Sequence, residues 1–120
     1  MEDLLLKIRW NINFIGEETK KVDGSPEVKD QILNAHELFV DAFGKCFEVD
    51  VDKEKVKEIV TPALKEFDRI IKEIENDDNN KILFMLLITH IADIKFLLSS
   101  EEEQKRIIES MKKSTEKEED

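Results

Sequence analysis

KILFMLLITHIADIKFLL, from Lys81 to Leu98, is the stretch that decides the fold of this chain. It is apolar without a break over its second to eighth residues and stays mostly apolar to its end. A helix that is apolar on all sides is surrounded either by other helices or by lipid. His90, Asp93 and Lys95 interrupt the stretch before it supplies the roughly 18 to 20 apolar residues that a bilayer span needs. We therefore predict a helix buried inside a protein core.

The composition predicts an all-α protein with one domain. A chain of 120 residues forms a single hydrophobic core. Only three glycines and two prolines accompany 40% charged and 40% hydrophobic residues, so most of the chain is helix-forming material. We expect a small bundle of four to five helices over residues 1–111, around a central hydrophobic helix at about 78–98. A charged, flexible tail is expected over residues 112–120.

The first predicted helix, from about Glu2 to Val22, has two apolar rows. The core row recurs at three- and four-residue steps and contains Leu4, Leu5, Ile8, Ile12, Ile15, Thr19 and Val22. A second row, formed by Leu6, Trp10 and Phe14, points more than about 100° away from the first. Either other helices of the same bundle cover this row, or it forms a subunit contact. Because aromatic residues are enriched in interface cores, we predict a homodimer contact through these three residues.

Turn and cap residues divide the chain before the central helix. Asp23-Gly24-Ser25-Pro26 ends the first helix and starts a second, which runs to about Phe47. Asp52 is predicted to cap a third helix that contains Pro62. This proline either kinks the helix or follows Thr61 as the cap of a new one.

Further signals place the remaining elements. Asp77 or Asp78 is expected to cap the central helix, and residues 47–51 are expected to be a linker. The Ser-x-x-Glu pattern from Ser100 to Glu103 predicts the start of a last helix. This helix has a narrow apolar edge, made of Gln104, Ile107, Ile108 and Met111.

The acidic charge balance narrows the range of partners. A formal net charge of −10 opposes the electrostatic attraction that nucleic acids and anionic membranes exert on basic proteins. We therefore expect neither nucleic acid nor membrane as a partner. The expected partner is a second copy of the chain, and the acidic surface would also suit a basic protein.

The single cysteine, Cys46, cannot form a disulfide within the chain, and no leader-like pattern opens the sequence. A cytoplasmic location is therefore expected. The richness in lysine and glutamate, with only Gln31 and Gln104 as glutamines, is typical of proteins from heat-adapted hosts.

The two histidines are the candidates for chemistry. His36 lies on the apolar face of the second helix, and His90 lies in the central helix with Asp93 three residues later. The favoured interpretation is structural, with the Asp93 carboxylate accepting a hydrogen bond from the His90 imidazole. In the alternative, His36, His90 and Asp93 converge on zinc or iron. No catalytic residue and no cofactor is otherwise indicated, because nucleophile and phosphate-loop motifs are absent from the sequence.

A second alternative concerns His36 alone. The segment Ala35-His36-Glu37-Leu38, with Gly44 further on, resembles the helix of histidine phosphotransfer domains. The resemblance implies phosphoryl transfer through His36. That family has a lysine and a glycine three and four residues after its histidine, whereas this chain has Phe39 and Val40. The prediction therefore remains a non-enzymatic interaction or regulatory module that acts as a homodimer.

Overall fold

Five α-helices and two short 3-10 turns make up this computed structural model, which describes residues 2–47 and 50–119, with side chains as far as Lys113. The elements are α1 (Glu2–Lys21), α2 (Pro26–Gly44), η1 (Lys45–Phe47), α3 (Lys53–Ile74), η2 (Asp78–Asn80), α4 (Lys81–Leu98) and α5 (Glu101–Glu119). The predicted all-α fold is confirmed, and the described ranges contain no β-strand. Of the linker predicted at residues 47–51, residues 48 and 49 lie outside the described ranges.

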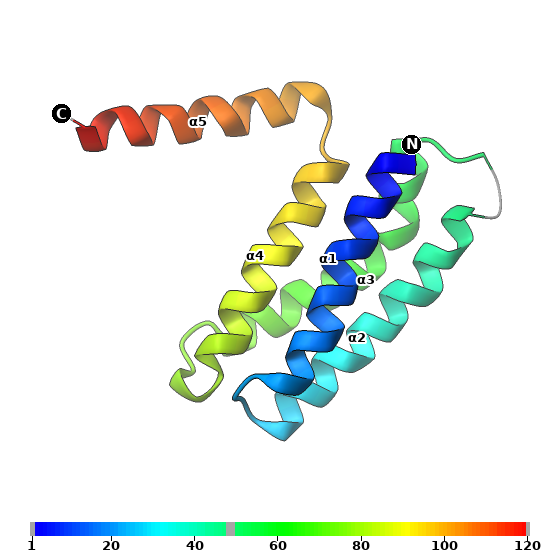
Figure 1. Cartoon of the computed structure of the whole chain (residues 1–120), viewed down its shortest axis with the longest axis vertical. Helices are drawn as coiled ribbons and strands as arrows, with labels where there is room; N and C mark the ends of the chain where they lie inside the picture. The colour runs from blue at the N-terminus through cyan, green and yellow to red at the C-terminus, as the bar shows by residue number, and fades with distance from the viewer. Residues whose placement is uncertain (1, 48–49, 120) are drawn as a thin grey trace.

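The first four helices form an antiparallel bundle in which each helix packs against its neighbours in the chain. The ring is closed by α1 against α4, which run side by side in opposite directions (Figure 1). Because α3 packs on both α2 and α4, the core lies along the middle of the four helices. The arrangement follows from short connections, which place consecutive helices antiparallel and adjacent.

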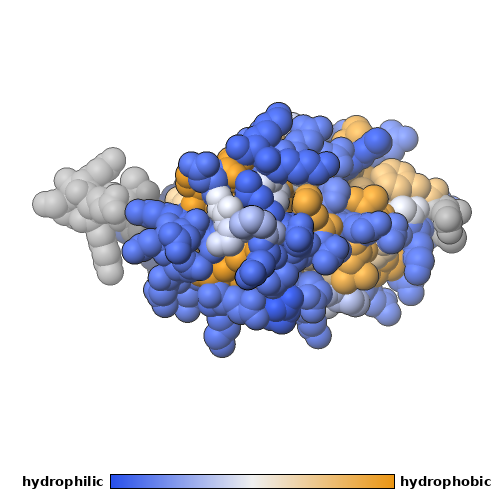
Figure 2. Space-filling view, turned by 90° about the horizontal axis from the view of Figure 1, so that it is seen from below, coloured by the Kyte–Doolittle hydropathy of each residue, from blue (hydrophilic) through white to orange (hydrophobic). Residues whose placement is uncertain are grey.

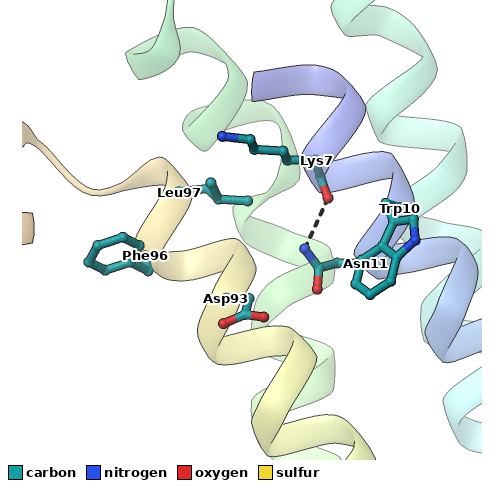
Figure 3. A pocket seen from close by; sticks show the side chains of 6 residues that line it. All are labelled: Lys7, Trp10, Asn11, Asp93, Phe96 and Leu97. Carbon is teal, nitrogen blue, oxygen red and sulfur yellow. Dashed lines mark hydrogen bonds between the residues drawn. The ribbon is translucent and has the colours of Figure 1, made fainter. Parts of the chain in front are cut away.

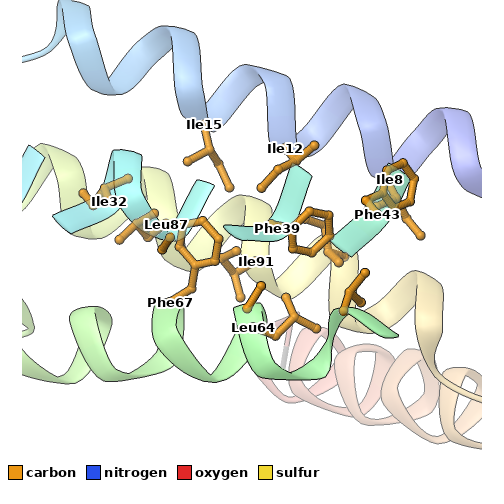
Figure 4. Packing of buried hydrophobic residues seen from close by; sticks show 14 of the residues in the cluster. Ile8, Ile12, Ile15, Ile32, Phe39, Phe43, Leu64, Phe67, Leu87 and Ile91 are labelled. Atoms are coloured by element: carbon orange, nitrogen blue, oxygen red, sulfur yellow. The ribbon is translucent and has the colours of Figure 1, made fainter. Parts of the chain in front are cut away.

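The core is built from apolar residues at helical spacing on all four helices (Figure 4). On α1 the predicted core row is correct, since Ile8, Ile12 and Ile15 are fully buried. Phe39 from α2 and Phe67 from α3 are also fully buried and fill the space between the helices. A fully buried side chain of this size contributes about 1.5 to 3 kcal/mol through its removal from water.

The position of α4 differs from the prediction. It is one of four equivalent helices rather than a central one, and its outward side meets solvent, with Ile82 49% and Met85 53% exposed. The reason is the size of the chain, because four helices of about 20 residues can form a ring but cannot enclose one another. No helix among the described residues has the length and hydrophobicity that a membrane crossing requires.

Several predicted helix ends are confirmed by their hydrogen bonds. The Asp52 side chain accepts from the Lys55 backbone N–H at 2.8 Å, and the Ser100 hydroxyl accepts from the Glu103 N–H at 3.2 Å. Helix α3 continues through Pro62 without a new start, and this proline is exposed. Because Pro62 lies on the solvent side of α3, the loss of its backbone N–H donor costs little stability.

Asn80 connects the two loops at one end of the bundle. It is almost fully buried, and its side-chain oxygen accepts from the Ser25 N–H at 2.8 Å. Its side-chain nitrogen donates to the Ser25 hydroxyl at 3.1 Å and to the Asp77 carboxylate at 2.8 Å. Gly24 beside it leaves room for Leu83, since a Cβ there would lie 2.3 Å from Leu83 Cδ1. These contacts join the α1–α2 and α3–α4 connections.

The last helix, α5, points away from the bundle (Figure 1). The Cα radius of gyration is 15.6 Å, against about 13.6 Å for a compact domain of this length. Helix α5 accounts for the difference, because the other four helices pack side by side. It runs to Glu119 and therefore includes residues 112–119 of the predicted tail as a helical segment, while the flexibility of that tail stays a prediction.

Candidate functional site

The outward sides of α1 and α4 carry several exposed apolar side chains, and we call the surface formed by these two sides the α1/α4 face. Its part on α1 is the second apolar row of that helix. Leu6 is 60% and Trp10 61% exposed, while Phe14 is half-buried. The ring centroids of Trp10 and Phe14 are 5.5 Å apart in a stacked arrangement. The bundle therefore leaves two of the three predicted contact residues, Leu6 and Trp10, largely exposed.

The part of the face on α4 is a row that we call the α4 outer stripe. It consists of Ile82, Met85, Thr89, Ala92 and Phe96. The first four of these residues are exposed and Phe96 is half-buried. The steps between them alternate between three and four residues, which is the spacing of a helix that packs along another helix. Together with the buried side, this row makes α4 apolar on nearly all sides in the sequence.

Other apolar residues on the surface are more scattered. Figure 2 views the bundle from the end with the α1–α2 and α3–α4 connections, where hydrophobic patches are separated by hydrophilic side chains. On α2, Leu38 and Val40 are exposed singly. Isolated exposed apolar residues are common in soluble proteins, whereas a contiguous apolar patch indicates an interaction site.

A shallow groove of about 260 Å³ lies between α1 and α4 within this face. Its lining is contributed by both helices and consists of Lys7, Trp10, Asn11, Asp93, Phe96 and Leu97 (Figure 3). The groove has one positive and one negative side chain at its border, together with aromatic and aliphatic surface. This lining is suited to a protein side chain or helix, because a polar border around an apolar centre is typical of protein interfaces.

Beneath the face, a buried hydrogen bond joins the two helices. His90 is only 8% exposed, and its Nδ1 lies 2.8 Å from Asn11 Oδ1. Asn11 uses its Nδ2 to donate to the Lys7 carbonyl at 2.9 Å, so its Oδ1 must be the acceptor and His90 Nδ1 the donor. The imidazole also lies against the Phe14 ring, with centroids 4.5 Å apart.

The hydrogen bond expected between His90 and Asp93 is replaced by this bond to Asn11. Asp93 is exposed at the groove and acts on the imidazole only through its charge. Burial lowers the pKa of His90, and the negative charge of Asp93 partly opposes that shift. Burial therefore favours the neutral form of the imidazole, whose Nδ1 is bonded to α1.

His36 is held in a separate place, between α2 and α1. A Cβ added at Gly16 would lie 2.6 Å from His36 Nε2, so the ring fills the space above that glycine. Its Nε2 is fully buried and finds no hydrogen-bond partner among the residues that the structure describes. Burial and the positive charge of Lys20 lower the pKa of His36, against smaller opposing effects of the Ile12 backbone and Glu37.

The positions of His36 and His90 bear on the two chemical alternatives, a metal site and phosphoryl transfer through His36. Within the described ranges, no three histidine, cysteine, aspartate or glutamate side chains converge on a point that could hold a metal. The structure therefore does not bring His36, His90 and Asp93 together. Phosphoryl transfer through His36 would require access to an imidazole nitrogen, whereas its Nε2 is packed against α1.

Cys46 is buried in η1 as a small core residue. Burial raises the pKa of its thiol. Because the thiolate is the nucleophilic form, this environment disfavours a catalytic role.

Comparisons with protein-family models, with curated proteins and with solved structures find no match. The functional argument therefore depends on the geometry of the chain itself.

Two features of the face were missed by sequence reasoning. The α4 outer stripe was assigned to the core because it is also largely apolar. Asn11 was not singled out, although an asparagine between the apolar positions Trp10 and Ile12 is a signal for a buried polar partner.

Proposed function

We propose that this protein is a non-enzymatic interaction module that acts as a homodimer, with the α1/α4 face at the subunit contact. The observation that carries the proposal is the exposure of Trp10, at 61%, beside a groove that it lines together with Phe96 and Leu97 of α4. Exposed apolar surface of this kind is typical of sites that bind other proteins.

The energy available at Trp10 is substantial. Covering its exposed 61% removes about 100 to 150 Å² of surface from water, worth about 3 kcal/mol. This is the magnitude of an interface hot spot, and tryptophan is among the residues most enriched there. In a two-fold dimer the contribution occurs twice, once for each copy.

The border of the face also suits contact with an identical copy. A two-fold interface brings the same patch of both subunits together, so the patch must be complementary to itself. Lys7 and Asp93 supply one charge of each sign beside the groove. Two copies can therefore meet with opposite charges facing each other, in spite of the overall charge of −10.

The same proposal places the dimer in the cytoplasm. It is supported by the single cysteine, which is buried in the core and has no second cysteine in the chain with which to form a disulfide.

Sedimentation equilibrium of the wild type and two variants tests the proposal. The wild type is expected at twice the 14.1 kDa chain mass, and Trp10→Ala is expected to shift it toward the monomer. Circular dichroism should show unchanged helix content in this variant, because Trp10 lies outside the core. Leu38→Ala, which removes an exposed apolar residue from α2, is the control and should remain dimeric.

Other outcomes would contradict the proposal. A wild type that sediments as a monomer at every concentration would rule out the dimer. Equal losses of helix content and assembly in Trp10→Ala would place this side chain in the monomer core. Stoichiometric zinc or iron in elemental analysis of the purified protein would overturn the non-enzymatic assignment.

Intrinsic fluorescence provides an independent measurement. Trp10 is the only tryptophan, and the chain has no tyrosine, so emission reports on this one position. Dilution below the dissociation constant should expose the indole to water and shift its emission to longer wavelength.

A further inference from the structure

Helix α5 has a narrow apolar side, which we call the α5 edge. It is formed by Gln104, Ile107, Ile108 and Met111. Ile107 is 38% and Ile108 43% exposed. An isolated helix of this length is only marginally stable in water, so α5 gains stability by packing its edge against another surface.

The contacts at the start of α5 direct it away from its own α4. The Gln104 side chain donates to the Phe96 carbonyl at 2.7 Å, and Ser100 caps the first turn of α5. Only Ser99 and Ser100 separate the two helices. These bonds hold Gln104 at the Phe96 end of its own α4, while the rest of α5 points away from that helix (Figure 1).

We propose that α5 of each copy packs along the α4 outer stripe of the other copy, so that the dimer forms by exchange of this helix. The inference rests on the proposed homodimer and names the segment that covers the α1/α4 face. It makes the contact reciprocal, since each copy donates one α5 and accepts one.

The dimensions of the two helices agree with this arrangement. Helix α4 has 18 residues and α5 has 19. At 1.5 Å per residue they are about 27 and 28 Å long. The α5 edge contains the steps of four and three residues from Gln104 to Ile108 and Met111, which match those of the α4 outer stripe. Thr89 and Ala92 are small residues in the middle of the stripe, where a second helix can approach closely.

The groove on the α1/α4 face continues toward the start of α5. A second hollow, of about 490 Å³, shares Lys7, Phe96 and Leu97 with the first and continues to Leu4 and Gln104 at the start of α5. The two hollows are adjacent at the Phe96 end of the α4 outer stripe, since Phe96 lines both. A helix that packs along the stripe would begin or end beside them.

Charges on both sides indicate the orientation of the exchanged helix. The α4 outer stripe has Asp93 on its α1 side and Lys95, which is paired with Asp68 of α3, on its other side. By helical rotation, the α5 edge has Lys105 and Lys112 along one side, and Glu103 along the other. An antiparallel arrangement of α5 and α4 sets the lysines toward Asp93 and the glutamate toward Lys95. A parallel arrangement would bring like charges together.

Substitution of the α5 edge in the full-length chain tests the exchange. The double variant Ile107→Ser with Ile108→Ser should raise the dissociation constant of the dimer at least 30-fold in sedimentation. On dilution, its Trp10 emission should shift at a correspondingly higher protein concentration than that of the wild type. The control places two serines on the opposite side of the same helix, Arg106→Ser with Glu109→Ser, and preserves the net charge. It should leave the dissociation constant within threefold of the wild type.

The failures of this inference and of the proposed function can be distinguished. If the edge variant dimerises as tightly as the wild type while Trp10→Ala dissociates, the exchange is wrong and the homodimer stands. If the wild type is a monomer, both are wrong.

A charge reversal tests the orientation. Asp93→Lys should weaken the dimer at least fivefold, and adding Lys105→Asp and Lys112→Asp should restore most of the affinity. A triple variant that binds no more tightly than Asp93→Lys would overturn the antiparallel arrangement.

Discussion

Gly16 gives the imidazole of His36 its space between α1 and α2, since a Cβ there would lie 2.6 Å from Nε2. Gly16→Ala should therefore destabilise the bundle by about 1 to 3 kcal/mol through overpacking, which exceeds the roughly 1 kcal/mol that alanine gains in helix propensity. Urea unfolding measures the change. Combining it with His36→Ala should remove most of the clash. Additive losses in the double variant would show that the ring and the added methyl group do not meet.

The two buried imidazoles predict how stability depends on pH. The pKa values of His36 and His90 are lowered, chiefly by burial. The unfolded chain therefore takes up protons first, as the pH falls through about 6.5. The free energy of unfolding should decrease from pH 7.5 to 5.5, by at most about 1.4 kcal/mol per pH unit for each histidine. Urea unfolding of the wild type and of His36→Gln with His90→Gln measures this, and an equal slope in both proteins would contradict it.

At the scale of the elements, the connection through Asn80 carries a prediction. Its amide makes three hydrogen bonds that join Ser25 and Asp77. Asn80→Ala leaves the Ser25 N–H without its acceptor in a partly buried place and should cost about 1 to 3 kcal/mol. The exposed Asn79→Ala is the matched control and should cost less than about 0.5 kcal/mol in the same chemical denaturation. Equal effects would mean that water replaces the Asn80 contacts.

The elements also show where sequence reasoning succeeds. The core row of α1, the cap at Asp52 and the start of α5 at Ser100 were predictable, because spacing and local hydrogen bonding determine them. The position of α4 was not, because its outer stripe is also largely apolar, with Ile82, Met85 and Phe96. Which side of an apolar helix is covered depends on the number of neighbours, and that is a property of the assembled bundle.

Only part of the candidate site could be predicted from the sequence. Leu6, Trp10 and Phe14 could be identified because they form a second row on a helix that already had a core row. The partner of His90 could not, because Asn11 is 79 residues away in sequence. Local spacing offered only Asp93, whose side chain lies at the groove instead.

At the scale of the whole molecule, the projecting α5 predicts a concentration-dependent pattern of amide protection. In the monomer, residues 104–111 should exchange their amide hydrogens rapidly, because α5 projects from the bundle and its side chains Ile107 and Ile108 are exposed. Under the exchange proposed above, these amides gain protection as the concentration exceeds the dissociation constant. Buried amides of α1 to α4 should be protected at both concentrations. Hydrogen exchange followed by mass spectrometry measures both, and rapid exchange of 104–111 in the dimer would contradict the exchange.

The closure of the ring by α1 and α4 has a kinetic consequence. Three of the four helix pairings join neighbours along the chain and form at little entropic cost, whereas this one brings together segments some 79 residues apart, as between Asn11 and His90. Refolding should therefore be fast. Alanine substitutions of core side chains in the contact between α2 and α3 should slow it. Alanine substitutions in the contact between α1 and α4 should instead accelerate unfolding, because that contact forms late. The lifetime of the native state thus depends on the first and last helices of the bundle.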